Sequence, residues 1–208
     1  MATDQQGELL GRWRELLPAN DDLGTDLLRR YAQAHRAYHT QAHLAQLLDM
    51  IDQLSDGTED LVAVRLAAWF HDAVYAVPTD PELPNEEASA QLARAELMAC
   101  GIAADTAAEV ERLVRLTATH DPAPDDAAGA LLCDADMSIL AATPADYRRY
   151  TDAIRQEYRH LDDKAFARGR LDFIISTLGR PIFHTVTGAR LGQQAASNLA
   201  AERRLLQT

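Results

Sequence analysis

The chain has 208 residues, of which 47% are hydrophobic, and its 20 Lys and Arg against 32 Asp and Glu give a formal net charge of -12. This length and hydrophobic content suffice for a sizeable core. The strongly negative charge argues against a protein that holds a nucleic-acid polymer by neutralising its phosphates. It leaves a small phosphate ester open, because a local basic pocket can exist on an acidic protein.

The two cysteines, Cys100 and Cys133, form neither a disulfide framework nor a metal-finger pattern. We therefore expect a cytoplasmic protein. The sequence begins without a basic region followed by an apolar stretch, and no apolar run reaches the length of a membrane span. We expect no membrane association.

The first third of the chain has helical periodicity. Residues 5–17 form an amphipathic segment that Pro18 ends, and a second segment runs from residues 20–22 toward Arg36. We expect a short break near Tyr38. Between residues 40 and 54, apolar side chains recur at spacings of three and four, which predicts a helix with one apolar stripe.

The segment from residue 59 to about residue 75 is apolar nearly all round, which predicts an interior helix. It ends in the dipeptide His71-Asp72, which places an imidazole and a carboxylate where a core is expected. Because an isolated buried charge is very costly, these side chains need hydrogen bonds, an ion partner or a bound cation. His71 and Asp72 are therefore our first candidates for metal ligands.

The remainder of the sequence continues as helices. Three prolines within residues 77–84 predict a loop, after which Asn85 is typical of a helix N-cap. We find no strand-hairpin pattern, no repeat and no flexible linker. The fold class is therefore predicted as all-α, a single-domain helical bundle over residues 1–208, with further helices at about 104–119, 129–140, 144–161, 164–177 and 187–206.

Other histidines are weaker candidates. His35, His39 and His43 are four residues apart and share a face if their helix is continuous, although a solvated stripe explains the same spacing. A second His-Asp pair, His120-Asp121, precedes a Pro-Ala-Pro sequence and so lies at a helix end or in a loop.

Two aspartates lie downstream among apolar residues. Asp134 and Asp136 are two apart, so on a helix they cannot point the same way, and we expect one of them to face the site. A helix N-cap at Asp134 is the alternative explanation for that residue.

The order of these residues resembles the H…HD…D ligand order of the HD-domain superfamily of metal-dependent phosphohydrolases, with His39, His71-Asp72 and Asp136 at the matching positions. The resemblance implies a helical domain in which these four residues meet at one buried divalent cation, and it favours Asp136 over Asp134 as the last ligand. It places the metal-site core at about residues 31–170, with the terminal helices packed on it. The strings that look like one poorly characterised bacterial branch of the superfamily are Arg36-Ala37-Tyr38-His39, Ala68-Trp69-Phe70-His71-Asp72, Asn85-Glu86-Glu87, Asp134-Ala135-Asp136 and Glu157-Tyr158-Arg159-His160.

Two imidazoles and two carboxylates suit Mn, Fe, Co, Ni or Zn, with Mg as a further candidate. The expected activity is hydrolysis of a small phosphate ester or nucleotide by a metal-activated water. Arg36, His43 and His120 are the candidates for holding the phosphate.

The resemblance adds acidic residues to the catalytic set. Besides Asp72, it suggests that Glu86 or Glu87 reaches the site as a base or as a hydrogen-bond partner of a ligand. Acidic residues in the first turn of a helix also occur for structural reasons alone, because they suit its positive end.

Two other interpretations fit parts of the sequence. Glu157 and His160 have the Glu-x-x-His spacing of di-iron carboxylate bundles, but such sites need two copies and the chain has one. A non-catalytic helical module that binds a metal or a nucleotide fits the same ligand order. For partners we expect a small phosphorylated substrate, no nucleic-acid polymer and no membrane, with the chain as a monomer or a homodimer.

Overall fold

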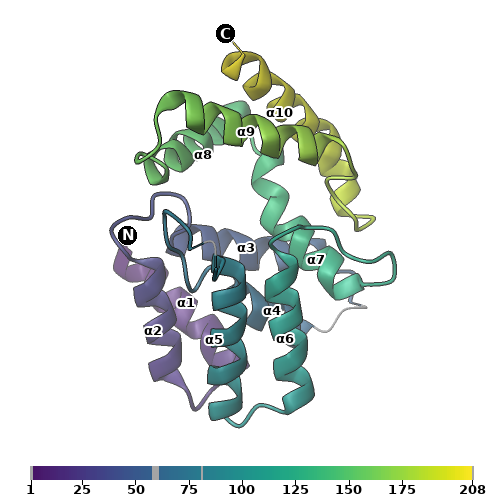
Figure 1. The fold of residues 1–208 in the computed structure, drawn as a ribbon. Coiled ribbons are helices and arrows are strands. Elements are labelled where there is room, and N and C mark those ends of the chain that lie inside the picture. The colour runs from purple at the N-terminus through teal and green to yellow at the C-terminus, as the bar shows by residue number, and fades with distance from the viewer. Residues whose placement is uncertain (1, 58–60, 81, 208) are drawn as a thin grey trace.

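A computed structural model describes residues 2–57, 61–80 and 82–207, and within these ranges it contains helices and no strand (Figure 1). The all-α prediction is confirmed. The helices in chain order are α1 (Ala2–Leu16), α2 (Asp21–Tyr31), α3 (Gln41–Leu54), α4 (Leu61–Phe70), α5 (Asn85–Ala99), α6 (Ala104–Leu116), α7 (Ala127–Asp136), the 3-10 helix η1 (Met137–Ala141), α8 (Pro144–Glu157), α9 (Asp163–Leu178), the 3-10 helix η2 (Gly188–Leu191) and α10 (Gly192–Leu206). None of the helices in the described ranges has both the length and the apolar character to cross a membrane.

The largest difference from the predicted helices lies before α3. Helix α2 ends at Tyr31 rather than near Arg36, and residues 32–40 are not helical. The backbone N–H groups of residues 37–39 donate to the side chain of Glu157 in α8, and the His39 carbonyl accepts from Arg36, so this backbone finds partners without a helix. The continuous helical face on which the three histidines would have been neighbours is therefore absent from this segment.

Two further boundaries differ. The interior helix α4 ends at Phe70 rather than near residue 75, while its predicted start at residue 59 lies outside the described residues. Asn85 is the first residue of α5 and not its cap. Its side chain instead accepts from the backbone N–H of Ala76 at 2.9 Å and donates to the Ala76 carbonyl at 3.1 Å, which fixes the preceding loop.

Helices α1 to α7 enclose the first of two hydrophobic cores. Helix α4 runs through it and packs against α3, α6 and α7, with all of residues 66–70 buried. The Trp13 and Trp69 rings meet edge to face with their centroids 5.0 Å apart. Because full burial of one large apolar side chain contributes about 1.5–3 kcal/mol, this helix is a rigid support for the residues that follow it.

The second core lies among η1, α8, α9 and α10, which form a separate layer above the first seven helices in Figure 1. Beside this core, Arg170 and Glu202 form a buried bidentate ion pair, in which Nε and Nη2 each donate to a carboxylate oxygen at 2.9 Å. The Tyr147 hydroxyl donates to the same carboxylate. The apolar side chains of this core are Met137, Leu140, Tyr147, Tyr150, Ile154, Ile174, Phe183, Ala195 and Leu199.

Candidate metal centre

His71 and Asp72 directly follow the buried helix α4. The His71 N–H still bonds to the Ala67 carbonyl at 2.8 Å, so the helical turn extends to this residue. The His71 Nδ1 lies 2.8 Å from the Ala68 carbonyl oxygen, which can only accept. Nδ1 therefore carries a proton, and Nε2 of the neutral imidazole presents a lone pair on the other side of the ring.

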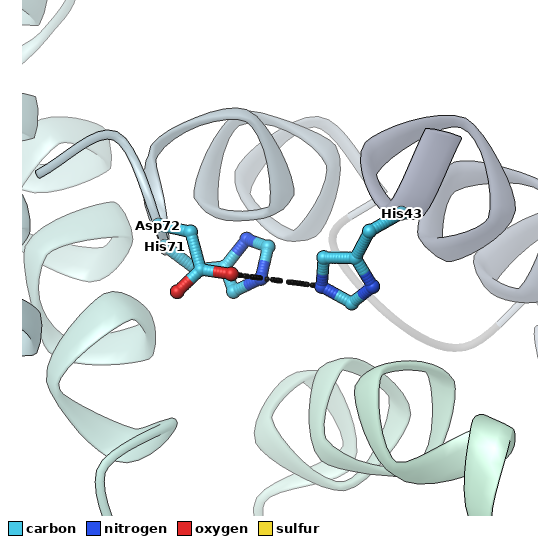
Figure 2. Close-up of side chains that lie close together, drawn as sticks. All are labelled: His43, His71 and Asp72. Atoms are coloured by element: carbon cyan, nitrogen blue, oxygen red, sulfur yellow. Dashed lines mark hydrogen bonds and ion pairs between the residues drawn. The ribbon is translucent and has the colours of Figure 1, made fainter. Parts of the chain in front are cut away.

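That Nε2 atom faces two further ligand-type atoms (Figure 2). It lies 3.1 Å from Nε2 of His43 and 2.9 Å from Oδ2 of Asp72, and the His43 and Asp72 atoms are 3.6 Å apart. Asp72 Oδ2 is buried and accepts no hydrogen bond from any residue that the structure describes. A buried carboxylate oxygen without a hydrogen bond beside two imidazole nitrogens is the arrangement that a cation stabilises.

Asp136 reaches the same place from the last residue of α7. Its Oδ1 lies 3.3 Å from His43 Nε2 and 3.8 Å from His71 Nε2, and its Oδ2 lies 2.8 Å from Nε2 of His120. His120 has a φ of 49°, in the left-handed region where histidine is one of the enriched side chains. His43, His71, Asp72 and Asp136 therefore present two nitrogens and two oxygens toward one another, with His120 behind Asp136.

His39 is adjacent to this set. Its ring centroid is 5.7 Å from that of His43, and its Nδ1 lies 2.7 Å from Oε2 of Glu157. The tightest group, whose ligand atoms all lie within 4.8 Å of one another, contains His43, His71 and Asp72. His43, suggested by the sequence for phosphate binding, therefore also becomes a candidate metal ligand, because its Nε2 lies beside the ligand atoms of His71 and Asp72.

The charges in the cluster stabilise one another. Burial by itself lowers the pKa of His71, but the carboxylates of Asp72 and Asp136 raise it to about 9. Burial by itself raises the pKa of both carboxyls, yet the neighbouring imidazoles hold the pKa of Asp72 and of Asp136 well below the ordinary value. Each carboxylate is therefore ionised at neutral pH, and a divalent cation competes with the extra proton of His71.

Arg36 is not placed to bind phosphate, contrary to the sequence prediction. Its buried guanidinium donates to the backbone carbonyls of Asp72 at 2.8 Å and His39 at 3.1 Å, and its Nε donates to the Gln33 side chain at 3.2 Å. Its carbon Cζ lies 5.2 Å from the ring centroid of Tyr31. Arg36 thus joins the 32–40 segment to the end of α4.

The two acidic residues of α5 do not join the cluster either. Both oxygens of Glu87 bind Arg115, at 2.6 and 2.9 Å, on the surface between α5 and α6. Glu86 is half-buried, and its charge acts on the hydroxyl of Tyr158. Glu87 therefore does not act as a base or as a hydrogen-bond partner of a metal ligand in this structure, because both of its carboxylate oxygens bind Arg115.

Asp134, the alternative to Asp136, faces away from the cluster. Its carboxylate is fully buried and accepts from the backbone N–H groups of His184 at 2.7 Å and Thr185 at 2.8 Å, and from the Thr185 hydroxyl at 2.7 Å. A side chain at Gly188 would collide with this carboxylate, so the glycine leaves space for it. Asp134 anchors the 184–188 segment, and it lies inside α7, which Asp126 caps.

The Glu157-x-x-His160 spacing does not produce a shared helix face. Glu157 is the last residue of α8, and His160 lies beyond it with an exposed side chain. The carboxylate of Glu157 binds His39 and the hydroxyl of Tyr75 instead. The geometry that a di-iron site requires of this motif is therefore missing.

A cavity of about 660 Å³ adjoins the cluster. His43 and Asp136 line it, and its walls come from α3, η1 and α8. Most of the lining is apolar or small, and among the described lining residues Arg149 is the one cation, which donates to Asp146. The cluster therefore borders a space large enough for a small organic molecule.

Sequence reasoning missed two features of this site. The place of His43 among the ligand atoms is not predicted, because the sequence suggests this residue for phosphate binding and the H…HD…D order supplies His39 as the histidine before His71. The carboxylate of Glu157 was considered only for a motif that the structure does not form. The signal for Glu157 was its presence in one of the strings that carried the family resemblance.

Comparison of the chain with protein-family models, with curated proteins and with solved structures gives no match.

Proposed function

We propose that this chain is a metal-dependent phosphohydrolase of the HD-domain type, acting on a small phosphate ester or nucleotide. The observation that carries the proposal is the convergence of three buried ligand-type atoms, in which Asp72 Oδ2 lies 2.9 Å from His71 Nε2 and 3.6 Å from His43 Nε2, and the two nitrogens are 3.1 Å apart. With Asp136 the donor set is two nitrogens and two oxygens, which fits Mn, Fe, Co, Ni or Zn by ligand type.

His43, His71, Asp72 and Asp136 would hold the ion, with His39 as a fifth candidate. A divalent ion bound by such a set supplies a Lewis acid for a phosphoryl oxygen and lowers the pKa of water. Several surrounding residues hold these side chains in position. The Ala68 carbonyl fixes the tautomer of His71, and His120 holds the outer oxygen of Asp136.

The cavity next to His43 and Asp136 supports a phosphomonoester with an uncharged body as the substrate. Additional phosphates would need cationic partners, and Arg149, the one cation among the described lining residues, already donates to Asp146. Ala37, Ala42 and Ala153 leave space in the walls for the rest of the molecule. A nucleoside monophosphate or a sugar phosphate of similar size meets these conditions.

A cytoplasmic location belongs to the same proposal, and so does a monomeric or homodimeric state. Cys100 and Cys133 are both free thiols, as expected for a reducing compartment.

The test is a screen of nucleotides, sugar phosphates and simple phosphomonoesters with Mn²⁺, Mg²⁺, Co²⁺ and Ni²⁺ supplied in turn. We expect turnover that a chelator abolishes and that is lost in Asp72→Ala and His71→Ala. Glu87→Gln is the matched control, since its carboxylate is held by Arg115. Ligand-dependent thermal stabilisation without turnover on any substrate would favour the non-catalytic binding module instead.

A further inference from the structure

Glu157 lies at the end of α8, which packs in the second core, yet its carboxylate bonds to residues 37–39 and Tyr75 beside the first core. It is the last residue of α8, its side chain is 0% exposed, and its partner His39 lies 118 positions earlier in the chain. A buried carboxylate is very costly unless its oxygens are satisfied. The hydrogen bonds to its two oxygens therefore identify the groups that the buried carboxylate holds in place.

One oxygen of Glu157 binds three consecutive peptide groups. Oε1 accepts from the backbone N–H of Ala37 at 2.7 Å, of Tyr38 at 2.8 Å and of His39 at 3.0 Å. Successive N–H groups that point at one anion form a nest, whose backbone is held by the charge at its centre. The non-helical course of the chain up to His39 is thus tied to this single side chain.

The other oxygen binds the imidazole itself. Oε2 lies 2.7 Å from Nδ1 of His39 and accepts from the hydroxyl of Tyr75 at 2.8 Å. An ionised carboxylate has no proton to donate, so Nδ1 of His39 must carry the hydrogen of that bond. In the neutral imidazole this leaves the lone pair on Nε2.

We propose that Glu157 is a positioning residue for His39: it holds the imidazole in its Nδ1–H tautomer and thereby presents Nε2 as a ligand to the cation. The proposal rests on the proposed function, because the cation is the one held by His43, His71, Asp72 and Asp136. It makes α8, on the second core, a determinant of metal affinity. Hydrogen bonds from a ligating histidine to a carboxylate fix the ring and raise its basicity in the same way.

Glu157→Gln separates this role from simple attachment of α8. The amide oxygen can still accept from the three peptide N–H groups, because the reverse orientation would place an NH₂ group against three donors. The amide nitrogen then meets His39 and can only donate. Nδ1 must accept, the hydrogen moves to Nε2, and the ligand nitrogen is blocked.

The matched control is Tyr75→Phe. It removes the other hydrogen bond to Oε2 and leaves the bond from His39 to the carboxylate intact. Simple loss of a contact to Glu157 would affect metal binding similarly in both variants, whereas tautomer control affects it in Glu157→Gln alone.

Two measurements test the proposal: Mn²⁺ affinity by titration calorimetry, and the tautomer of His39 by ¹⁵N NMR of the metal-free protein at a pH where the imidazole is neutral. We expect Nδ1–H in the wild type, Nε2–H in Glu157→Gln, and a loss of Mn²⁺ affinity of roughly 10- to 100-fold in that variant, as is typical of outer-shell residues. Tyr75→Phe should change the Mn²⁺ affinity by less than about threefold, which is below the 10- to 100-fold range typical of outer-shell residues.

An Nε2–H tautomer in the wild type overturns the proposal, as does a Glu157→Gln protein with unchanged Mn²⁺ affinity. If the wild type binds no Mn²⁺ at all, the proposed function fails separately, and the NMR comparison of the two proteins still decides whether Glu157 sets the tautomer. If Glu157→Gln does not fold, the tautomer in the wild type and in Tyr75→Phe decides it: Nδ1–H in both supports the proposal, and Nε2–H in either overturns it.

Discussion

Helices α1 to α7 provide the four side chains whose ligand atoms converge, whereas η1 and α8 to α10 provide the groups that hold and border them. His43 extends from α3, His71 and Asp72 follow α4, whose residues 66–70 are all buried, and Asp136 ends α7. The second core contributes Glu157 and one wall of the cavity. The ligand atoms that lie closest to one another are thus held by the helices of the first core, whereas the second layer holds the adjacent residue, His39.

The largest expected effect concerns the second core alone. Glu202→Ala leaves Arg170 buried without its bidentate partner, so we expect a loss of about 3–5 kcal/mol in the free energy of unfolding. Urea denaturation followed by circular dichroism measures it. Mn²⁺ affinity at a temperature where the variant is folded should stay at the wild-type value, and a parallel fall in affinity would contradict the division between the two regions.

The next effect concerns the two aspartates of α7. Asp136→Ala should weaken Mn²⁺ binding by more than the roughly 10- to 100-fold typical of an outer-shell residue, because it removes one of the converging oxygens. Asp134→Ala should lower the unfolding temperature, because it leaves the His184 and Thr185 N–H groups without their acceptor, and it should leave Mn²⁺ affinity unchanged. Calorimetric titration of both variants would refute this assignment if their affinities fell equally.

A smaller effect is expected from pH. The pKa of His71 is raised to about 9, so the stability that its charge contributes in the chelated protein is complete below pH 6.5 and is lost as the pH rises through 9. Burial by itself raises the pKa of Glu157, but the imidazole of His39 and the peptide N–H groups that bond to the carboxylate lower this pKa to about 2. The stability that the Glu157 charge contributes is therefore present above pH 4.5 and is lost as the pH falls through 2. The unfolding temperature should therefore be highest between these limits. Added Mn²⁺ should stabilise the protein more at pH 8 than at pH 6, and the opposite trend would conflict with a cation that displaces the proton of His71.

The smallest effect is expected on the surface of α5. Glu87→Gln breaks an exposed ion pair with Arg115, and such pairs contribute about 0–1 kcal/mol. Thermal unfolding and Mn²⁺ titration should both stay close to the wild-type values. A marked loss of metal affinity in this variant would restore the catalytic role that the sequence suggested for this residue.

Local patterns predicted the helical class and the position of His71 and Asp72, because a helix without a polar face must be buried and its polar end must be compensated. They also indicated that Asp134 and Asp136 cannot point the same way, and the structure gives the two carboxylates different partners. These inferences needed only the periodicity of a helix.

The parts that failed depend on partners far away in the sequence. Arg36 has the residue type of a phosphate ligand, but its guanidinium is occupied by carbonyls of the segment after α4, 36 positions later. The non-helical course of residues 37–39 depends on Glu157, more than 100 positions away, whose carboxylate accepts from their three peptide N–H groups. No local pattern contains such information, because the competing hydrogen bonds exist only once the two layers have met.

The most direct test of the metal centre is the anomalous scattering of a crystal grown with Zn²⁺. We predict one strong peak between His43 Nε2, His71 Nε2, Asp72 Oδ2 and Asp136 Oδ1, at about 2.0–2.2 Å from these atoms as is typical of nitrogen and oxygen ligands of zinc. A crystal without a peak there, in which Asp72 Oδ2 instead accepts a hydrogen bond from a protonated imidazole, would contradict it.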